Sequence, residues 1–375
     1  MKNIYTTPKP RLFYVDNIRV FVVICVVMHH LAVTYSGDGL FYYVEPPQMY
    51  GILQTIWFSF YLSFQQAYFM GLLFLLAGFF VAEAYDRKGF RSFISDRFNR
   101  LITPTLIYMV IISPFVKYIL LGQKISEFNL LDFMFSYGVM WFAVALFIFS
   151  FIYACARKFH HKDIPAVQSG NRDLTFSKLC VLILIITICA FLIRIIQPRG
   201  SAVLGMQLCH FASYIILFIV GIFSYRFDFF SQINYQTGKH WLISGVVLSF
   251  LVWLAFVVVL TRTGNQSAIK GGLNVYSAIY ALWESFTAVA VCVGLIGVFK
   301  EKFNKRNVLL KAMSDSSFTV YMFHPPIIVG VALLFQNVML FPVVKWLILC
   351  PISIVLCFTI AHFVLRKIPL LGKIL

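Results

Sequence analysis

Ten apolar stretches, each about as long as a helix that crosses a bilayer, follow one another along the chain. Hydrophobic residues make up 61% of the 375 residues, charged residues make up 12%, and the mean hydropathy is +0.86. A water-soluble core does not hide so much apolar surface, so the sequence predicts an all-α integral membrane protein. The predicted spans are residues 13–35, 62–85, 101–121, 134–156, 177–197, 207–226, 241–261, 276–299, 317–336 and 343–365. Residues 52–61 either lie along the membrane or begin a tilted helix.

Basic residues are unevenly divided between the loops. The terminal segments and alternate loops on one side hold 23 of the 31 Lys and Arg residues. The positive-inside rule therefore predicts a multi-pass protein with both termini in the cytoplasm. The net charge of +17 is explained by this topology, and no folded nucleic-acid-binding module is evident, so we expect membrane lipids and not nucleic acid as partners. No linker or internal repeat is visible, and residues 1–375 are predicted to form a single domain.

Several kinds of chemistry lack their sequence signatures. The eight cysteines form no CxxC pair or other metal-ligand spacing, so we expect buried thiols and no metal site. The phosphate-binding loop GxxxxGK[ST], the zinc motif HExxH and the nucleophile motif GxSxG are also missing. The candidate site must therefore come from polar residues within the apolar spans.

The first span carries ionisable residues that are costly in lipid. Arg19 and His30 are eleven positions apart, so they lie on one helical stripe, roughly 16 Å apart along the axis. His29 is rotated about 80° from Arg19, which makes His30 the better aligned histidine. Asp16 lies one turn before Arg19 and is expected to pair with it. This pattern predicts an active-site helix; the alternative is that the charged pair sits at the headgroups and the histidines at the outer interface.

A second candidate site is the segment "DRFNRLITP" at the cytoplasmic start of the third span. Its i, i+3 spacing places Arg97 and Arg100 on one helical face. Guanidinium groups bind phosphate in a bidentate manner, so the pair suits the phosphates of an intracellular cofactor. Arg91 and Lys88 add charge to the same surface. The alternative is that these residues only anchor the loop in the cytoplasm.

Two further polar residues lie within predicted spans. His324, in "SDSSFTVYMFHPPII" (314–328), is followed by Pro325 and Pro326. Prolines at these positions free backbone carbonyls and bend a helix, often beside a cavity. His324 therefore either contacts a ligand or forms a hydrogen bond between helices. Glu284, in "YALWESF", requires a partner inside the membrane.

A histidine within the membrane, an arginine beneath it and a cytoplasmic phosphate clamp fit a group transfer from a phosphorylated donor. The chain also resembles the membrane acyltransferase-3 family, near its glucan succinyltransferase and O-antigen acetyltransferase branch. The resemblance extends over nearly the whole length. It is carried by D-x-x-R and His30 in the first span, "FLLAGFF" (74–80), the RxxR segment, "MWFAVALF" (140–147), "YIILFIVGIFSYR" (214–226) and "SSFTVYMFHPPII".

This resemblance implies about ten membrane helices in a bacterial plasma membrane, a cytoplasmic acyl-CoA donor (acetyl-CoA or succinyl-CoA) and an envelope glycan or related sugar as acceptor. It implies that His30 is catalytic, with Arg19 and Asp16 as its partners, and that Arg97, Arg100, Arg91 and Lys88 bind the coenzyme. His324, Glu284 and Trp141 are expected in the substrate pocket. Transient acylation of His30 is an alternative to its action as a general base. A transporter or flippase is the rival function, and the oligomeric state, a homodimer included, stays open.

Overall fold

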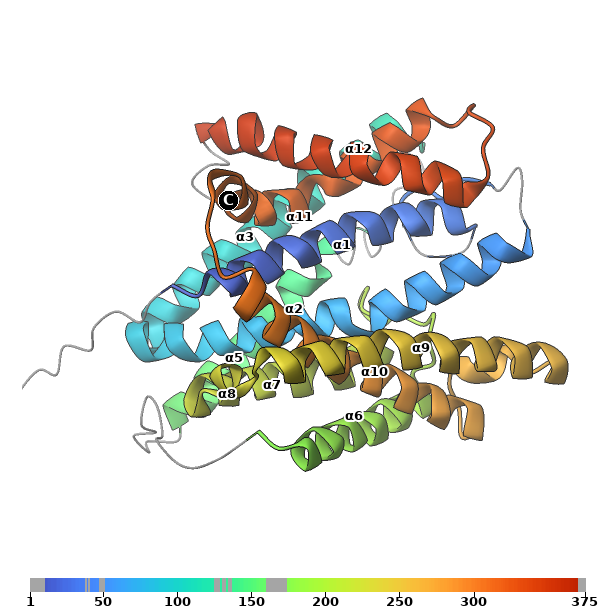
Figure 1. The fold of residues 1–375 in the computed structure, drawn as a ribbon. Helices are drawn as coiled ribbons and strands as arrows, with labels where there is room; N and C mark the ends of the chain where they lie inside the picture. Colours follow the sequence, from blue (N-terminus) through green and yellow to red (C-terminus); the bar gives the residue numbers. More distant parts are fainter. Residues whose placement is uncertain are drawn as a thin grey trace, which may run out of the picture.

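The computed structural model describes residues 11–37, 39, 41–46, 51–124, 129, 133, 137–159 and 174–369, and within these ranges the chain is helical without any β-strand. Figure 1 shows the helices as a bundle of long, roughly aligned rods. They are α1 (Phe13–Ser36), α2 (Ile52–Arg97), α3 (Thr103–Ile107), α5 (Trp141–Phe159), α6 (Phe176–Ile196), α7 (Phe211–Phe227), α8 (Phe229–Gln232), α9 (Tyr235–Thr263), α10 (Val275–Lys302), α11 (Val308–Leu334) and α12 (Pro342–Phe363). The fold class predicted from the sequence is confirmed.

The number of long helices differs from the number of predicted spans. Nine helices in the described residues are long and apolar enough to cross a membrane, and the longest, Ile52–Leu120, contains both the predicted 62–85 and 101–121 spans. This helical run bends at Gly89, whose φ of 69° and ψ of 174° interrupt α2. That backbone region is essentially restricted to glycine. In Figure 1 the chain runs along α2 and then turns back through α3 toward the opposite end. Residues 52–61 belong to α2, as its first turns.

Several helix starts are encoded locally by asparagine. The side chains of Asn234, Asn274 and Asn307 each accept a hydrogen bond from the backbone N–H three residues later, at 2.8, 2.9 and 2.7 Å. A side-chain oxygen at this position satisfies a backbone donor that the helix itself leaves unpaired. These caps fix where α9, α10 and α11 begin.

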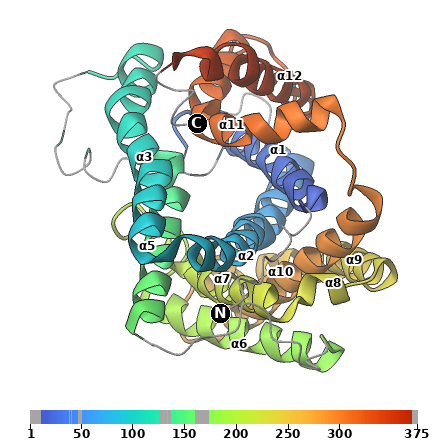
Figure 2. The same cartoon turned by 90° about the vertical axis from the view of Figure 1, so that its left-hand side faces the viewer.

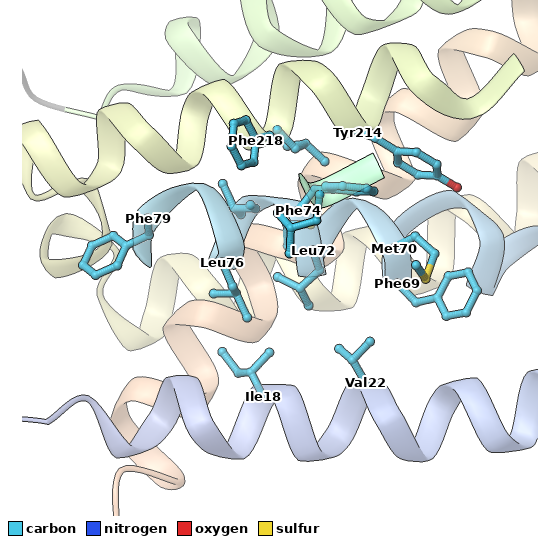
Figure 3. Close-up of a cluster of buried hydrophobic side chains, with 14 of the residues drawn as sticks. Ile18, Val22, Phe69, Met70, Leu72, Phe74, Leu76, Phe79, Tyr214 and Phe218 are labelled. Carbon is cyan, nitrogen blue, oxygen red and sulfur yellow. The ribbon is translucent and has the colours of Figure 1, made fainter. Parts of the chain in front are cut away.

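Helix α2 is central to the packing. Its side chains Leu72, Phe74 and Leu76 lie in the buried cluster of Figure 3, between Ile18 and Val22 of α1 on one side and residues of α7 on the other. The end view in Figure 2 places α6, α7, α9 and α10 on one side of α2, and α1, α11 and α12 on the other.

Glycines allow α2 and α7 to approach closely. A Cβ atom added to Gly78 would lie 2.1 Å from the carbonyl oxygen of Phe218, and one added to Gly221 would lie 2.0 Å from that of Leu75. Small residues at contact points let membrane helices pack backbone against backbone. The segments "FLLAGFF" and "YIILFIVGIFSYR", far apart in the sequence, therefore pack directly against each other.

The basic loops gather at one end of the bundle. Asn17 Nδ2 donates hydrogen bonds to the carbonyl oxygens of Phe303 and Lys305 at 2.6 and 3.0 Å, which joins the start of α1 to the loop before α11. Asp86, which lies in α2 just before the bend at Gly89, forms ion pairs with Arg226 at 2.5 Å and with Arg157 at 3.2 Å. The loops that the charge pattern assigns to the cytoplasm thus share one end. Their orientation across the membrane stays a prediction.

Candidate active site

The ring of His30 lies between two other rings. On one side it stacks on Phe41, with centroids 4.5 Å apart and planes 22° apart. On the other side it stacks on His324 of α11, with centroids 5.0 Å apart and planes 23° apart. His30 Nδ1 is buried and has no hydrogen-bond partner among the described residues. The structure thus joins two of the histidines predicted as site residues into one pair.

His324 is fully buried, and its two ring nitrogens have different surroundings. Nδ1 lies 2.8 Å from the carbonyl oxygen of Tyr321 and 3.3 Å from that of Val320. Nε2 is buried and has no hydrogen-bond partner in the described part of the chain. An unpaired buried polar atom of this kind costs free energy unless a ligand or water satisfies it.

The histidine beside His30 has a different environment, as the helical geometry predicts. The ring of His29 packs against Phe69 of α2, with centroids 4.9 Å apart, and meets the ring of His30 edge-on. The stack with Phe41 and His324 therefore involves His30 and not His29.

A short loop segment, residues 41–46, covers His30 from the end opposite to the basic loops; we call it the strap. Its Phe41 forms the stack on His30, and its Tyr42 hydroxyl bonds to the hydroxyls of Tyr108 and Ser113 at 2.8 and 3.0 Å. Glu45 forms an ion pair with the buried Lys345 of α12 at 2.6 Å. The sequence reasoning missed the strap, because no motif connects a loop aromatic residue to a histidine on the preceding helix.

At the other end of the His30 stripe, Arg19 is available to a ligand. Its side chain is 49% exposed and lies 3.9 Å from Asp16, close to the limit for an ion pair. Asp16 is paired more closely with Arg11, at 2.8 Å. The predicted pairing of Asp16 with Arg19 is therefore weak, and Arg11 is the partner that the sequence reasoning missed.

The structure separates the two arginines of the RxxR segment. Arg100 is 70% exposed and pairs with Asp96 at 3.0 Å, and Lys88 pairs with the same carboxylate at 2.9 Å. Arg97 forms no ion pair among the described residues. Its guanidinium lies 5.2 Å from the ring centre of Phe93, and its Nε is buried and has no hydrogen-bond partner in the described part of the chain.

Arg97 also lies close enough to Arg19 for the two positive charges to repel each other. Two weakly paired cations from different helices, α1 and α2, form a site that favours an anion. Arg91, by contrast, is exposed on the adjoining surface. The two candidate sites found in the sequence are therefore the two ends of one stripe, with Arg19 and Arg97 at one end and His30 with His324 at the other.

Glu284 is held in a buried network away from this stripe. It forms an ion pair with Arg194 of α6 and a hydrogen bond of 3.2 Å with His210 Nδ1. Arg194 and Glu284 are both buried, and the Arg194 Nε also donates to the carbonyl oxygen of Cys209 at 3.3 Å. The partner that Glu284 required is therefore Arg194, a residue that the sequence reasoning did not single out. This network ties α6, α7 and α10 together.

Trp141 begins α5 and stacks on Tyr214, with centroids 5.6 Å apart. No ring contact joins it to His30 or His324 in the part of the chain that the structure describes. Its neighbour Val139 accepts a hydrogen bond from the Tyr321 hydroxyl. The segment around Trp141 thus supports α11 close to His324.

The arrangement provides an anion site and a stacked imidazole pair on one stripe. In the residues searched, no three His, Cys, Asp or Glu side chains are grouped to hold a metal ion. Among protein families, the model for acyltransferase 3, described as an acyltransferase domain, matches residues 12–362. No curated protein and no solved structure matches the chain.

Proposed function

Because the chain belongs to the membrane acyltransferase-3 family, we propose that it transfers an acetyl or succinyl group from cytoplasmic acyl-CoA to a hydroxyl of an envelope glycan or related sugar. The observation that carries this proposal is the stripe along α1. It has weakly paired arginines at one end and a stacked imidazole pair at the other. The proposed location is the plasma membrane of a bacterium, with the basic loops in the cytoplasm.

Acyl-CoA matches the two ends of the stripe. Its phosphates sit at one end of a long, flexible arm and its thioester sits at the other. Arg19 and Arg97 would bind the phosphates, and Arg100, Arg91 and Lys88 would raise the local concentration of anions. Arg19 and His30 are separated by eleven residues, or roughly 16 Å of helix, so the arm would run along α1 toward the histidines.

In the proposed reaction His30 acts as the general base. It takes the proton from the acceptor hydroxyl while the hydroxyl oxygen attacks the thioester carbonyl carbon. The carbon–sulfur bond then breaks, and the coenzyme thiolate takes up the proton and leaves as a thiol. A positioned base contributes about 10²- to 10⁴-fold in rate. The stacking of the His30 ring on Phe41 and on His324 would hold the His30 imidazole in position for this step. Transient acylation of His30 is the alternative route to the same products.

The deciding experiment measures the transfer itself. The full-length protein, in its own membranes, is supplied on the cytoplasmic side with acetyl-CoA or succinyl-CoA labelled in the acyl group, and the envelope glycans are examined by mass spectrometry. Labelled ester on glycan, together with an equal amount of free coenzyme thiol, is the expected result. Movement of a solute across the membrane without a covalent product would overturn the proposal in favour of a transporter.

A further inference from the structure

We propose that Pro325 locks the tautomer of His324, so that the bare Nε2 of His324 binds a second hydroxyl of the acceptor, beside the hydroxyl that reacts at His30. The acceptor would then carry two hydroxyls on neighbouring carbons, as a sugar ring does. This inference rests on the proposed function for the identity of the reaction, but the tautomer lock stands independently of it.

The first step is set by the backbone. In an α-helix the carbonyl of Tyr321 would accept a hydrogen bond from the backbone N–H of residue 325. Residue 325 is proline, which has no N–H, so this carbonyl is left free inside α11. The Nδ1 of His324 lies 2.8 Å from it and takes the place of the missing donor.

The second step follows from the chemistry of the imidazole. A carbonyl oxygen only accepts hydrogen bonds, so Nδ1 must carry the hydrogen. In a neutral imidazole the other nitrogen, Nε2, is then an acceptor with a free lone pair. A neutral histidine can adopt either tautomer. The proline that follows His324 favours the tautomer with the hydrogen on Nδ1, because it leaves the Tyr321 carbonyl free to accept that hydrogen.

The third step concerns what Nε2 faces. The His324 side chain is fully buried, and its Nε2 has no hydrogen-bond partner among the described residues. The ring of His30 is the neighbouring imidazole, with centroids 5.0 Å apart, but no hydrogen bond joins it to His324 Nε2 among the described residues. In this proposal the partner of Nε2 is a donor that the acceptor brings to the site.

The fourth step identifies that donor. A hydroxyl has one hydrogen, so the hydroxyl that gives its proton to His30 has none left for His324. A different hydroxyl must fill the second position. Because the two ring centroids lie only 5.0 Å apart, neighbouring hydroxyls of one sugar ring are suited to reach both imidazoles. His324 would thus select the acceptor and fix its orientation.

The experiment uses the full-length protein and has two measurements. The first is the ¹⁵N spectrum of histidine-labelled protein in membranes, in which the His324 signals are identified by their loss in H324Q. We expect an unprotonated Nε2 in the wild type, and a mixture of tautomers in P325A, where the restored N–H competes for the Tyr321 carbonyl. P326A is the matched control, because it restores a bond to Met322 and should leave the His324 signals unchanged. A protonated Nε2 in the wild type would overturn the lock.

The second measurement is acyl ester on envelope glycans, made by cells whose own copy of the gene is replaced by each variant. H324A and P325A should lower the ester content about tenfold or more, whereas P326A should stay near the wild type. H324Q, which keeps a polar atom near the Nε2 position, should retain more transfer than H324N, which keeps one near Nδ1. The ester should sit on a ring carbon whose neighbour carries a free hydroxyl.

Two results would overturn the binding role of His324. One is equal transfer by H324A, P325A and P326A. The other is an ester placed on a hydroxyl that has no hydroxyl on an adjacent carbon. Absence of any transfer by the wild-type protein would instead refute the proposed function and the acceptor assignment with it, while the nitrogen spectrum still decides the tautomer lock.

Discussion

The imidazole rings of His30 and His324 are stacked, with their centroids 5.0 Å apart, although one belongs to α1 and the other to α11. The pair exists only where these two helices pack against each other. It also places His324, whose Nδ1 bonds to the backbone of its own helix, next to His30, whose Nδ1 has no hydrogen-bond partner among the described residues. The consequences of this arrangement are open to measurement.

Replacing His30 should abolish acyl transfer without removing the protein from the membrane. The expected loss for His30→Ala is about 10²-fold or more, because a positioned general base is removed. The measurement is labelled acyl group on glycan per unit of membrane-bound protein. His29→Ala is the matched control, since His29 packs against Phe69 and lies outside the stack. Equal losses in the two variants would contradict the assignment of the base to His30.

The two arginines of the RxxR segment should differ in their effect on donor binding. Arg97→Ala is expected to weaken acyl-CoA binding about tenfold or more, because it removes a guanidinium near Arg19 that forms no ion pair among the described residues. Arg100→Ala should have a smaller effect, since Arg100 is exposed and paired with Asp96. Equilibrium binding of acyl-CoA to the purified protein, at low and high salt, tests the difference. An equal or reversed order would mean that Arg97 does not face the donor.

Replacing Glu284 should lower the stability of the protein more directly than it affects catalysis. Glu284→Gln leaves Arg194 buried without its carboxylate, and the expected cost is about 3–5 kcal/mol in the free energy of unfolding. The paired replacement Arg194→Met with Glu284→Leu should recover most of this loss, because neither charge is then buried alone. Thermal unfolding in detergent compares the variants. If the single variant unfolds like the wild type but loses transfer, Glu284 belongs to the substrate site after all.

The strap should act through the orientation of His30. Phe41→Ala removes one of the two rings that hold the imidazole, and we expect kcat to fall about 2- to 10-fold, with little change in the KM for acyl-CoA. Tyr43→Ala, in the same strap, keeps Phe41 and both strap anchors and serves as the control. A rise in the KM for acyl-CoA with an unchanged kcat would show that the strap lies on the donor path instead.

Much of the fold was predictable because the membrane restricts the choice of structure. Lipid offers no partner for backbone polar groups, so long apolar runs must be helices, and their length and the loop charges set their number and their sides. Each of the ten predicted spans overlaps an observed helix, with ends that differ by a few residues in the described part of the chain. Two of them share one helical run, which changes direction at Gly89. Hydropathy does not detect such a turn.

The candidate site was only partly predictable, and the reason is geometric. Helical periodicity along α1 distinguished His30 from His29 and placed Arg19 on the same stripe, since neighbours within one helix are fixed by 3.6 residues per turn. The ion partners were not predictable in this way: Asp16 pairs with Arg11 more closely than with Arg19, and Glu284 pairs with Arg194 from another helix. Contacts between helices depend on packing and rotation, which no local pattern contains.

The sequence by itself therefore determined that the chain is a helical membrane protein, that costly polar residues lie along α1, and that a proline follows His324. Only the tertiary structure decided that His324 stacks on His30, that the Phe41 ring of the strap stacks on His30, and that Arg97 of α2 comes near Arg19 of α1. Secondary structure follows from local hydrogen bonding and the transfer of side chains into lipid. The active-site pair follows from the close approach of helices, which small residues and buried ion pairs far from the site make possible.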